Sequence, residues 1–173
     1  MNAFLLLIPF LLIRFGLLLL LNKNAVERAA HFAPVCGKEK IAYVIYQLST
    51  LFLFIYLLFL TVHPNISFIF IAGCICYILG LILCAIAAVY FAKPNSIGLN
   101  TNGIYRFSRN PMYLAYFFCF IGMALLTQSL ILLSIILLFQ ISAHWIILSE
   151  ERWCIQTFGV AYQNYMKRVR RYL

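Results

Sequence analysis

Long apolar runs separated by short polar segments dominate the chain. A spanning helix needs about 20 apolar residues at a rise of about 1.5 Å each, and five stretches come close to that length. The fourth and fifth share one block, 111–148, which is too long for a single span and is interrupted at Thr127-Gln128-Ser129. A tight hairpin with a short fourth span of roughly 24 Å fits this block, and one long bent helix is the alternative. The runs are 3–21, 41–62, the stretch after His63-Pro64-Asn65 up to Ala92, and the two halves of 111–148.

The composition supports lipid as the solvent of these runs. Of the residues 65% are hydrophobic and 10% are charged, which is far from the usage of a soluble domain. Hydrocarbon satisfies no backbone hydrogen bonds, so spanning segments must be helices or a closed barrel, and the runs lack the alternation of barrel strands. The fold class predicted is therefore all-α, a polytopic integral membrane protein of about five transmembrane helices.

The basic residues predict the orientation of the helices. Twelve of the 13 Lys and Arg residues lie in three polar segments, 22–40, 93–110 and the tail from Arg152 onward. Five spans place these segments on one side, and the two opposite turns contain no Lys or Arg. The positive-inside rule then puts the C-terminus in the cytosol. The net charge of +9 is better explained by anionic lipid heads than by nucleic acid, and no nucleic-acid partner is expected.

The tail and the cysteines add little chemistry. From Trp153 onward, aromatic and apolar residues recur mostly three or four apart, which indicates an amphipathic helix at the headgroup level. The six cysteines form no C-x-x-C pair and have no histidine at metal-ligand spacing, so neither a metal site nor a disulfide framework is predicted. The tail residues concerned are Phe158, Tyr162, Tyr165, Val169 and Tyr172.

Paired carboxylates mark one candidate site. All four acidic residues fall in the predicted cytosolic layer, and Glu150 and Glu151 are adjacent where the fifth span leaves the membrane. The pair is either a helix end tied to arginines such as Arg152 or Arg109, or a carboxylate site for a cation.

The segment 103–113 forms a second candidate site, at the mouth of the fourth span. Asn110 and Pro111 are a preferred N-cap and first helical residue. The unpaired N–H groups of that helix start, with Arg106 and Arg109 nearby, could hold a carboxylate or a phosphate.

The C-terminal half resembles the isoprenylcysteine carboxyl methyltransferase family, and the same half recurs in phospholipid N-methyltransferases. The shared features are an arginine-rich stretch before a proline, a hydrophobic hairpin, a Glu pair, and a Phe-Gly-x-x-Tyr-x-x-Tyr tail. In this sequence they are Gly103, Tyr105, Arg106, Arg109, Pro111 and Tyr113, then Glu150 and Glu151, then Phe158, Gly159, Tyr162 and Tyr165.

The resemblance implies a pocket for S-adenosylmethionine and a lipid-like or hydrophobic acceptor that enters from the membrane. It implies a cofactor-binding methyltransferase region over 93–173, preceded by N-terminal spans over 1–92. The implied catalytic residues are Glu150, Glu151, Arg109 and Asn110. The implied cofactor-binding residues are Leu99, Asn100, Tyr105, Asn110, Pro111, Met112, Tyr113 and Glu151. The candidate substrate-binding residues are His144 and Arg106.

The sequence also departs from the family pattern. Asn110 stands where the family usually has His, Ala115 where it has Gly, and Ile97 where a loop histidine is common. Carboxyl-methylating members carry an arginine shortly before the Glu pair, and this chain has Trp145-Ile146-Ile147 there. The acceptor is therefore open between a carboxylate, such as that of a prenylcysteine, an amine and a thiol. A non-enzymatic carrier or assembly subunit on the same scaffold is the alternative function.

Two expectations concern the rest of the molecule. Arg14 lies inside the first span, where a charge is costly, and it either pairs with a distant group or extends to one interface. The membrane is the plasma membrane for a prokaryotic protein and the endoplasmic reticulum for a eukaryotic one.

Overall fold

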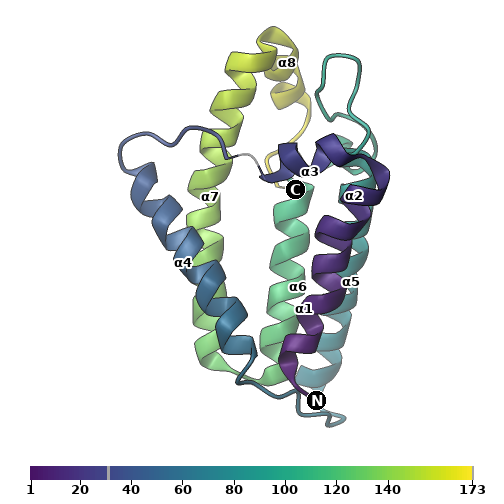
Figure 1. Ribbon diagram of the computed structural model, residues 1–173, viewed down its shortest axis with the longest axis vertical. Helices are drawn as coiled ribbons and strands as arrows, with labels where there is room; N and C mark the ends of the chain where they lie inside the picture. The colour runs from purple at the N-terminus through teal and green to yellow at the C-terminus, as the bar shows by residue number, and fades with distance from the viewer. Residues whose placement is uncertain (31, 173) are drawn as a thin grey trace.

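The chain folds into a bundle of long helices that run along one common axis (Figure 1). The computed structural model describes residues 1–30 and 32–172. Over these residues the regular structure is helical, and β pairing is limited to two isolated bridges. Four segments are long and apolar enough to cross a membrane: Ala3–Leu21, Glu39–Leu57 (α4), Phe68–Phe91 (α5) and Leu130–Phe158 (α7). The predicted all-α membrane fold is confirmed.

The predicted short fourth span is the apolar helix Pro111–Thr127 (α6), with 17 residues. Its hairpin partner follows at once, because Gln128 adopts a left-handed conformation (φ 50°) that ends α6. Ser129 then begins α7, since its hydroxyl accepts a hydrogen bond from the N–H of Leu132 at 3.2 Å, which is an N-cap. The hairpin is confirmed, and the single bent helix is excluded.

The first span is helical throughout but changes its winding. It consists of a 3₁₀ turn (η1, Ala3–Leu6), α1 (Leu7–Leu11), a π-helical stretch (η2, Leu12–Leu17) and α2 (Leu18–Leu21). The π-helical stretch contains Arg14, and such stretches are frequent at functional sites. A short helix, α3 (Lys23–Ala30), follows and lies across the end of this span.

Two predicted boundaries were wrong. The second span ends at Leu57 rather than at Val62, because the following backbone pairs with the N-terminus: Ala3 N–H donates to Leu60 O at 2.9 Å, and Val62 N–H donates to Met1 O at 2.8 Å. The tail helix does not begin at Trp153. Since no helix breaker occurs before Gly159, α7 continues through Trp153 to Phe158.

The chain turns at Gly159, where φ is +52°, a conformation that glycine adopts without strain. The amphipathic helix that follows is Val160–Arg168 (α8). Its apolar face is covered by the protein, because Tyr162, Tyr165 and Val169 are buried against Leu99. The tail therefore packs onto the loop between α5 and α6.

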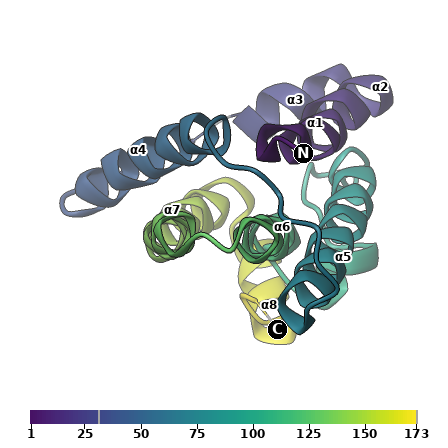
Figure 2. The ribbon, with the colours of Figure 1, turned by 90° about the horizontal axis from the view of Figure 1, so that it is seen from below.

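Close packing sets the core of the bundle. Figure 2 shows α6 between α7 and α5, with α1 nearby. Helices α5 and α6 approach so closely that a Cβ at Gly80 would clash with the backbone of Cys119, and a Cβ at Gly122 would meet that of Tyr77. Small residues at membrane helix contacts permit such approach. This contact holds the middle of α6 against α5, and the candidate site lies at the start of α6.

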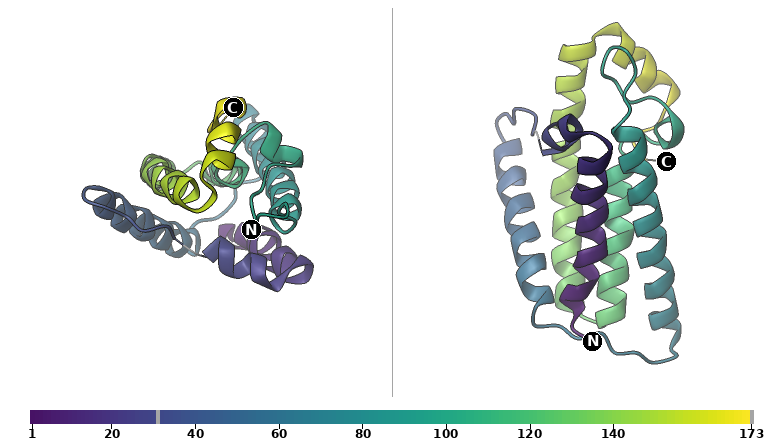
Figure 3. Two further views of the ribbon diagram at one scale, coloured as in Figure 1. Left: turned by 90° about the horizontal axis from the view of Figure 1, so that it is seen from above. Right: turned by 45° about the vertical axis from the view of Figure 1, so that its right-hand side comes forward.

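The three basic segments gather at one end of the bundle, as the five-span topology predicted. Helix α3, the 92–110 loop and α8 lie together there, and the N-terminus lies at the opposite end (Figures 1 and 3). We call this the polar end.

Candidate functional site

A cavity of about 530 Å³ lies at the polar end, within the size range of small-molecule sites. Its walls come from η2, α3, α4, the 92–110 loop, α6, α7 and α8. It therefore draws on both sides of the predicted boundary at residue 92. The lining residues used below are Arg14, Arg28, Ala29, Phe32, Tyr46, Leu99, Asn100, Tyr105, Arg109, Asn110, Pro111, Met112, Tyr113, Tyr116, Glu150, Glu151, Trp153 and Phe158.

The two adjacent glutamates have different surroundings. Glu151 is buried and accepts hydrogen bonds from Arg109 (Nε at 3.1 Å, Nη2 at 2.8 Å) and from Arg171 (Nη2 at 2.8 Å). Arg109 is itself buried, and its Nη1 donates to the carbonyls of Met166 and Val169. This ion-pair network joins the start of α6 to α7 and the tail.

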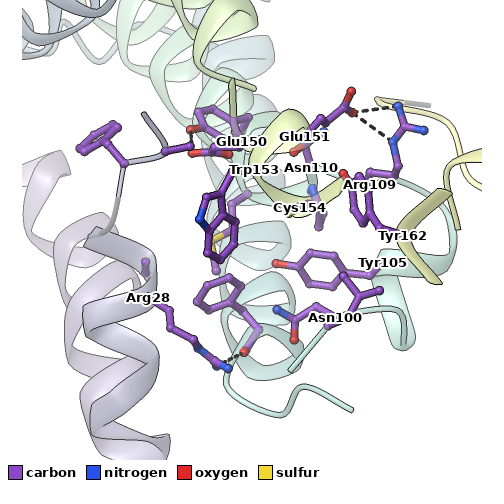
Figure 4. A pocket seen from close by; sticks show the side chains of 18 of the residues that line it. Arg28, Asn100, Tyr105, Arg109, Asn110, Glu150, Glu151, Trp153, Cys154 and Tyr162 are labelled. Carbon is purple, nitrogen blue, oxygen red and sulfur yellow. Dashed lines mark hydrogen bonds and ion pairs between the residues drawn. The ribbon is translucent and has the colours of Figure 1, made fainter. Parts of the chain in front are cut away.

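Glu150 has no arginine partner among the described residues. Its carboxylate accepts one hydrogen bond, from the Tyr113 hydroxyl at 2.8 Å, and its side chain lines the cavity. Neighbouring helical residues point about 100° apart, and in Figure 4 Glu151 turns toward Arg109 while Glu150 lies beside Trp153. Of the pair, Glu150 is the carboxylate that remains available to a ligand.

The start of α6 presents free backbone donors to the same cavity. Asn110 makes no side-chain cap; instead its Nδ2 donates to Arg171 O at 3.2 Å. The N–H groups of the first helical turn have no partner within the helix, and Pro111 has none to offer. Met112 and Tyr113 therefore supply the free N–H groups beside the cavity, which suit a carboxylate.

The loop before α6 adds a buried acceptor. Asn95 Oδ1 accepts hydrogen bonds from the N–H groups of Ile97 (3.2 Å) and Leu99 (2.8 Å), which shapes a turn. Asn100 follows, and its Oδ1 is buried without a hydrogen-bond partner among the described residues. Buried polar groups are normally hydrogen-bonded, so this oxygen indicates a ligand donor at the cavity.

Tyrosines from the 92–110 loop and from α8 also line the cavity. The Tyr165 hydroxyl donates to the backbone carbonyl of Tyr105 at 2.6 Å, which ties α8 to the short helix η3 (Gly103–Arg106). Burial raises the pKa of Tyr105 and of Tyr165 above that of free tyrosine. Both side chains therefore stay neutral at physiological pH.

The cavity extends from the polar end into the membrane layer. At about 1.5 Å per residue, Arg14 lies about 10 Å inside the first span, with Tyr46 and Tyr116 at similar depths in α4 and α6. Arg14 Nη2 donates to Ala29 O at 2.9 Å, and its guanidinium lies over the Tyr116 ring at 5.6 Å. Its Nη1 is buried and has no hydrogen-bond partner among the described residues. An intramembrane arginine costs about 2.5–3.5 kcal/mol on insertion scales.

The predicted residues divide into two groups. The structure brings together around the cavity Glu150, Glu151, Arg109, Asn110, Leu99, Asn100, Tyr105, Pro111, Met112 and Tyr113. The candidate substrate residues lie elsewhere: His144 Nδ1 bonds the Tyr172 hydroxyl at 2.8 Å, and Arg106 lines a separate surface hollow beside Tyr90 and Phe107. Those two do not line the cavity.

Sequence reasoning missed several cavity residues. Tyr46, Tyr116 and Trp153 line the cavity, but an aromatic residue in an apolar run has no distinguishing pattern. Arg14 did have a signal, because a charge within a span is rare and usually functional. Its partner could not be named from the sequence.

One comparison with known proteins gives a match to the chain. A family model described as phospholipid methyltransferase matches residues 68–161, from the start of α5 to the start of α8. This range contains the Glu pair, the 92–110 loop and the start of α6, and it excludes Arg14. No curated protein and no solved structure matches the chain. Since the match covers more than half of the 173 residues, the chain belongs to the phospholipid methyltransferase family, a family of membrane methyltransferases for lipid-like substrates.

Proposed function

We propose that the protein transfers a methyl group from S-adenosylmethionine to a lipid-like acceptor, in a cavity that faces the cytosol. The observation that carries this proposal is the composition of one cavity wall. Among the described residues, that wall is lined by a carboxylate without an arginine hydrogen-bond partner, an amide oxygen without a hydrogen-bond partner, and the first residues of α6, whose N–H groups have no partner within the helix. The opposite, deeper wall is aromatic and lies in the membrane layer.

The residues present fit the charges of S-adenosylmethionine. The donor carries a cationic sulfonium, an ammonium and a carboxylate. Glu150 would hold the cationic part, and Asn100 Oδ1 would accept a hydrogen bond from an N–H of the ligand. The N–H groups of Met112 and Tyr113 would hold the carboxylate. Aromatic faces such as Trp153 suit a cation and a flat ring.

The chemistry requires alignment more than a dedicated nucleophile. S-adenosylmethionine, when bound, would supply a methyl group on a sulfonium: a lone pair of the acceptor would bond to the methyl carbon while the C–S bond breaks, and its electron pair would leave with sulfur as a neutral thioether. The chain positions the acceptor in line and excludes water. An amine acceptor must also lose a proton. A carboxylate acceptor needs no base.

The Glu151 network has a positioning role in this proposal. Arg109 and Arg171 hold the tail against the start of α6, and α8 then covers the cavity with the face that carries Tyr162 and Tyr165. Glu151 is already engaged by two guanidinium groups, so we assign the direct ligand contact to Glu150.

The test is isothermal titration of the detergent-purified protein with S-adenosylmethionine and S-adenosylhomocysteine. Wild type is expected to bind with micromolar affinity. Because a hydrogen bond to a charged group contributes about 1.5–3 kcal/mol, Glu150→Gln should weaken binding at least about tenfold. Glu39→Gln is the matched control: Glu39 pairs with Arg152 and does not line the cavity.

Two results would count against the proposal. Unchanged affinity in Glu150→Gln would remove the proposed cation contact. If folded wild-type protein bound neither compound, a non-enzymatic role for the scaffold would be favoured.

A further inference from the structure

Arg14 differs from the other cations of the cavity because one of its buried nitrogens has no hydrogen-bond partner among the described residues, although its charge also interacts with Glu150. Arg109 is paired with Glu151, and Arg28 is exposed and donates to Phe91 O at 2.9 Å. Arg14 forms no ion pair with any described residue. Of its guanidinium nitrogens, Nη2 bonds a backbone carbonyl, and Nη1 is buried without a partner among the described residues.

The depth and surroundings of Arg14 define what could answer that charge. The group lies about 10 Å inside the span, on the cavity wall. It contacts the rings of Phe15 and Tyr116 and the Ala29 carbonyl, and its charge interacts with Glu150. A water-soluble anion would have to leave its hydration shell to reach this depth. An acidic group carried on an apolar chain can reach it while the chain stays in the membrane layer.

We propose that Arg14 binds an acidic group, a carboxylate or a phosphate, of the amphiphilic molecule that accepts the methyl group. This inference rests on the proposed function and names the substrate class: an anionic amphiphile. The guanidinium matches both oxyanions because its N–H groups form a fork that contacts two oxygens.

Arg14 comes from a different part of the chain than the candidate contacts for the methyl donor, although its charge acts on one of them, Glu150. The candidate contacts for the donor, Asn100, Met112 and Glu150, belong to the polar end and to the segment that matches the family. Arg14 comes from the first span, outside that segment, and approaches from the membrane layer. The acceptor's acid group would thus lie deeper than the donor, with the reacting atoms between them.

The π-helical winding contributes to this placement. A π-helical stretch inserts an extra residue into an α-helix, and here it spans Leu12–Leu17 with Arg14 inside. The shifted phase directs Arg14 to the cavity, where it lies over Tyr116. A positively charged side chain is thereby held where the sequence alone shows an apolar helix.

The experiment measures binding rather than turnover. The full chain, in phosphatidylcholine nanodiscs with S-adenosylhomocysteine, is titrated with radiolabelled dodecanoate, dodecyl phosphate and the neutral isostere dodecanamide, and empty nanodiscs are subtracted. The variants are Arg14→Gln, Arg14→Lys and the matched control Lys23→Gln. Lys23 is an exposed cation near the same end of the first span and does not line the cavity.

The expected result is selective. Wild type binds at least one of the acids at least about tenfold more tightly than dodecanamide, and the preferred acid distinguishes a carboxylate acceptor from a phosphate one. Arg14→Gln loses this preference, Arg14→Lys retains part of it, and Lys23→Gln behaves as wild type. S-adenosylhomocysteine affinity stays unchanged in all three variants.

Other results would overturn the inference or the function separately. Equal binding of the acids and dodecanamide by wild type removes the inference, and this result does not depend on whether Arg14→Gln folds. An acid preference that survives in Arg14→Gln also removes it. A loss of S-adenosylhomocysteine affinity in folded Arg14→Gln assigns Arg14 to the donor instead. Acid preference without S-adenosylhomocysteine binding by wild type retains the anion site and refutes the methyltransferase proposal.

Discussion

Replacing Glu151 tests the division of labour within the glutamate pair. Glu151→Gln keeps the size of the side chain but removes the charge that holds Arg109, whose side chain is 7% exposed, and Arg171, whose side chain is 31% exposed. Removing one partner of a buried ion pair costs about 3–5 kcal/mol, because the other charge stays buried without compensation. The Arg171 half, being partly solvated, contributes less. We expect a loss of about 3–5 kcal/mol in the free energy of unfolding.

The chain carries its own reporter for this loss. Cys84 and Cys119 are buried free thiols, while the other four cysteines are exposed or partly exposed. In a chain whose other four cysteines are replaced by alanine, a thiol-reactive fluorogenic dye reports the opening of the core during heating or titration with a denaturing detergent. Glu39→Gln is the matched control, because the Arg152 side chain is 41% exposed and the Glu39 side chain 13% exposed, so that losing this partly solvated pair should cost less than losing the buried Glu151 network. Glu151→Gln within about 1 kcal/mol of wild type would refute the reasoning, because the network would then not hold the tail.

Three further predictions follow from the packing, the turn at Gly159 and the topology. Gly80→Ala should lower the free energy of unfolding by about 1–3 kcal/mol, because the new methyl group meets the backbone of Cys119; the same assay with Gly16→Ala, where the nearest atom is 3.9 Å away, should show a smaller effect. Gly159→Ala should cost about 1–3 kcal/mol through backbone strain alone, since nothing lies within 4 Å of the added Cβ; an unchanged unfolding midpoint would contradict this. In a chain with Cys36 as its sole cysteine, an impermeant maleimide should label inverted vesicles and spare intact cells, and the reverse would overturn the cytosolic orientation.

Most of the fold could be read from the chain because the membrane imposes a simple rule. Backbone groups in hydrocarbon must pair within their own segment, so the apolar runs could only be helices. The lengths of the runs predicted the spans, and the basic loops predicted which ends of the helices lie on the same side. The hairpin at Gln128 and Ser129 followed from two polar residues in an apolar block. The boundaries at Leu57 and Phe158 did not, because they depend on the N-terminal backbone and on the absence of a breaker before Gly159.

The candidate site was predicted less completely than the fold. Motif residues such as Tyr113 and Asn100 could be named, since their order in the chain resembles a family. The different surroundings of Glu150 and Glu151 could not be predicted from the sequence, because the two residues are identical and adjacent. One helical step directs Glu151 to two arginines and Glu150 to the cavity.

The sequence by itself determined that the chain is a helical membrane protein and which end of the bundle carries most of its charges. These properties depend only on the composition of the chain and on the order of its residues. Tertiary structure decided which charges are paired. Whether Arg14 meets a carboxylate, a carbonyl or an open cavity depends on helices distant in the sequence, and in this fold its Nη1 is left without a partner among the described residues.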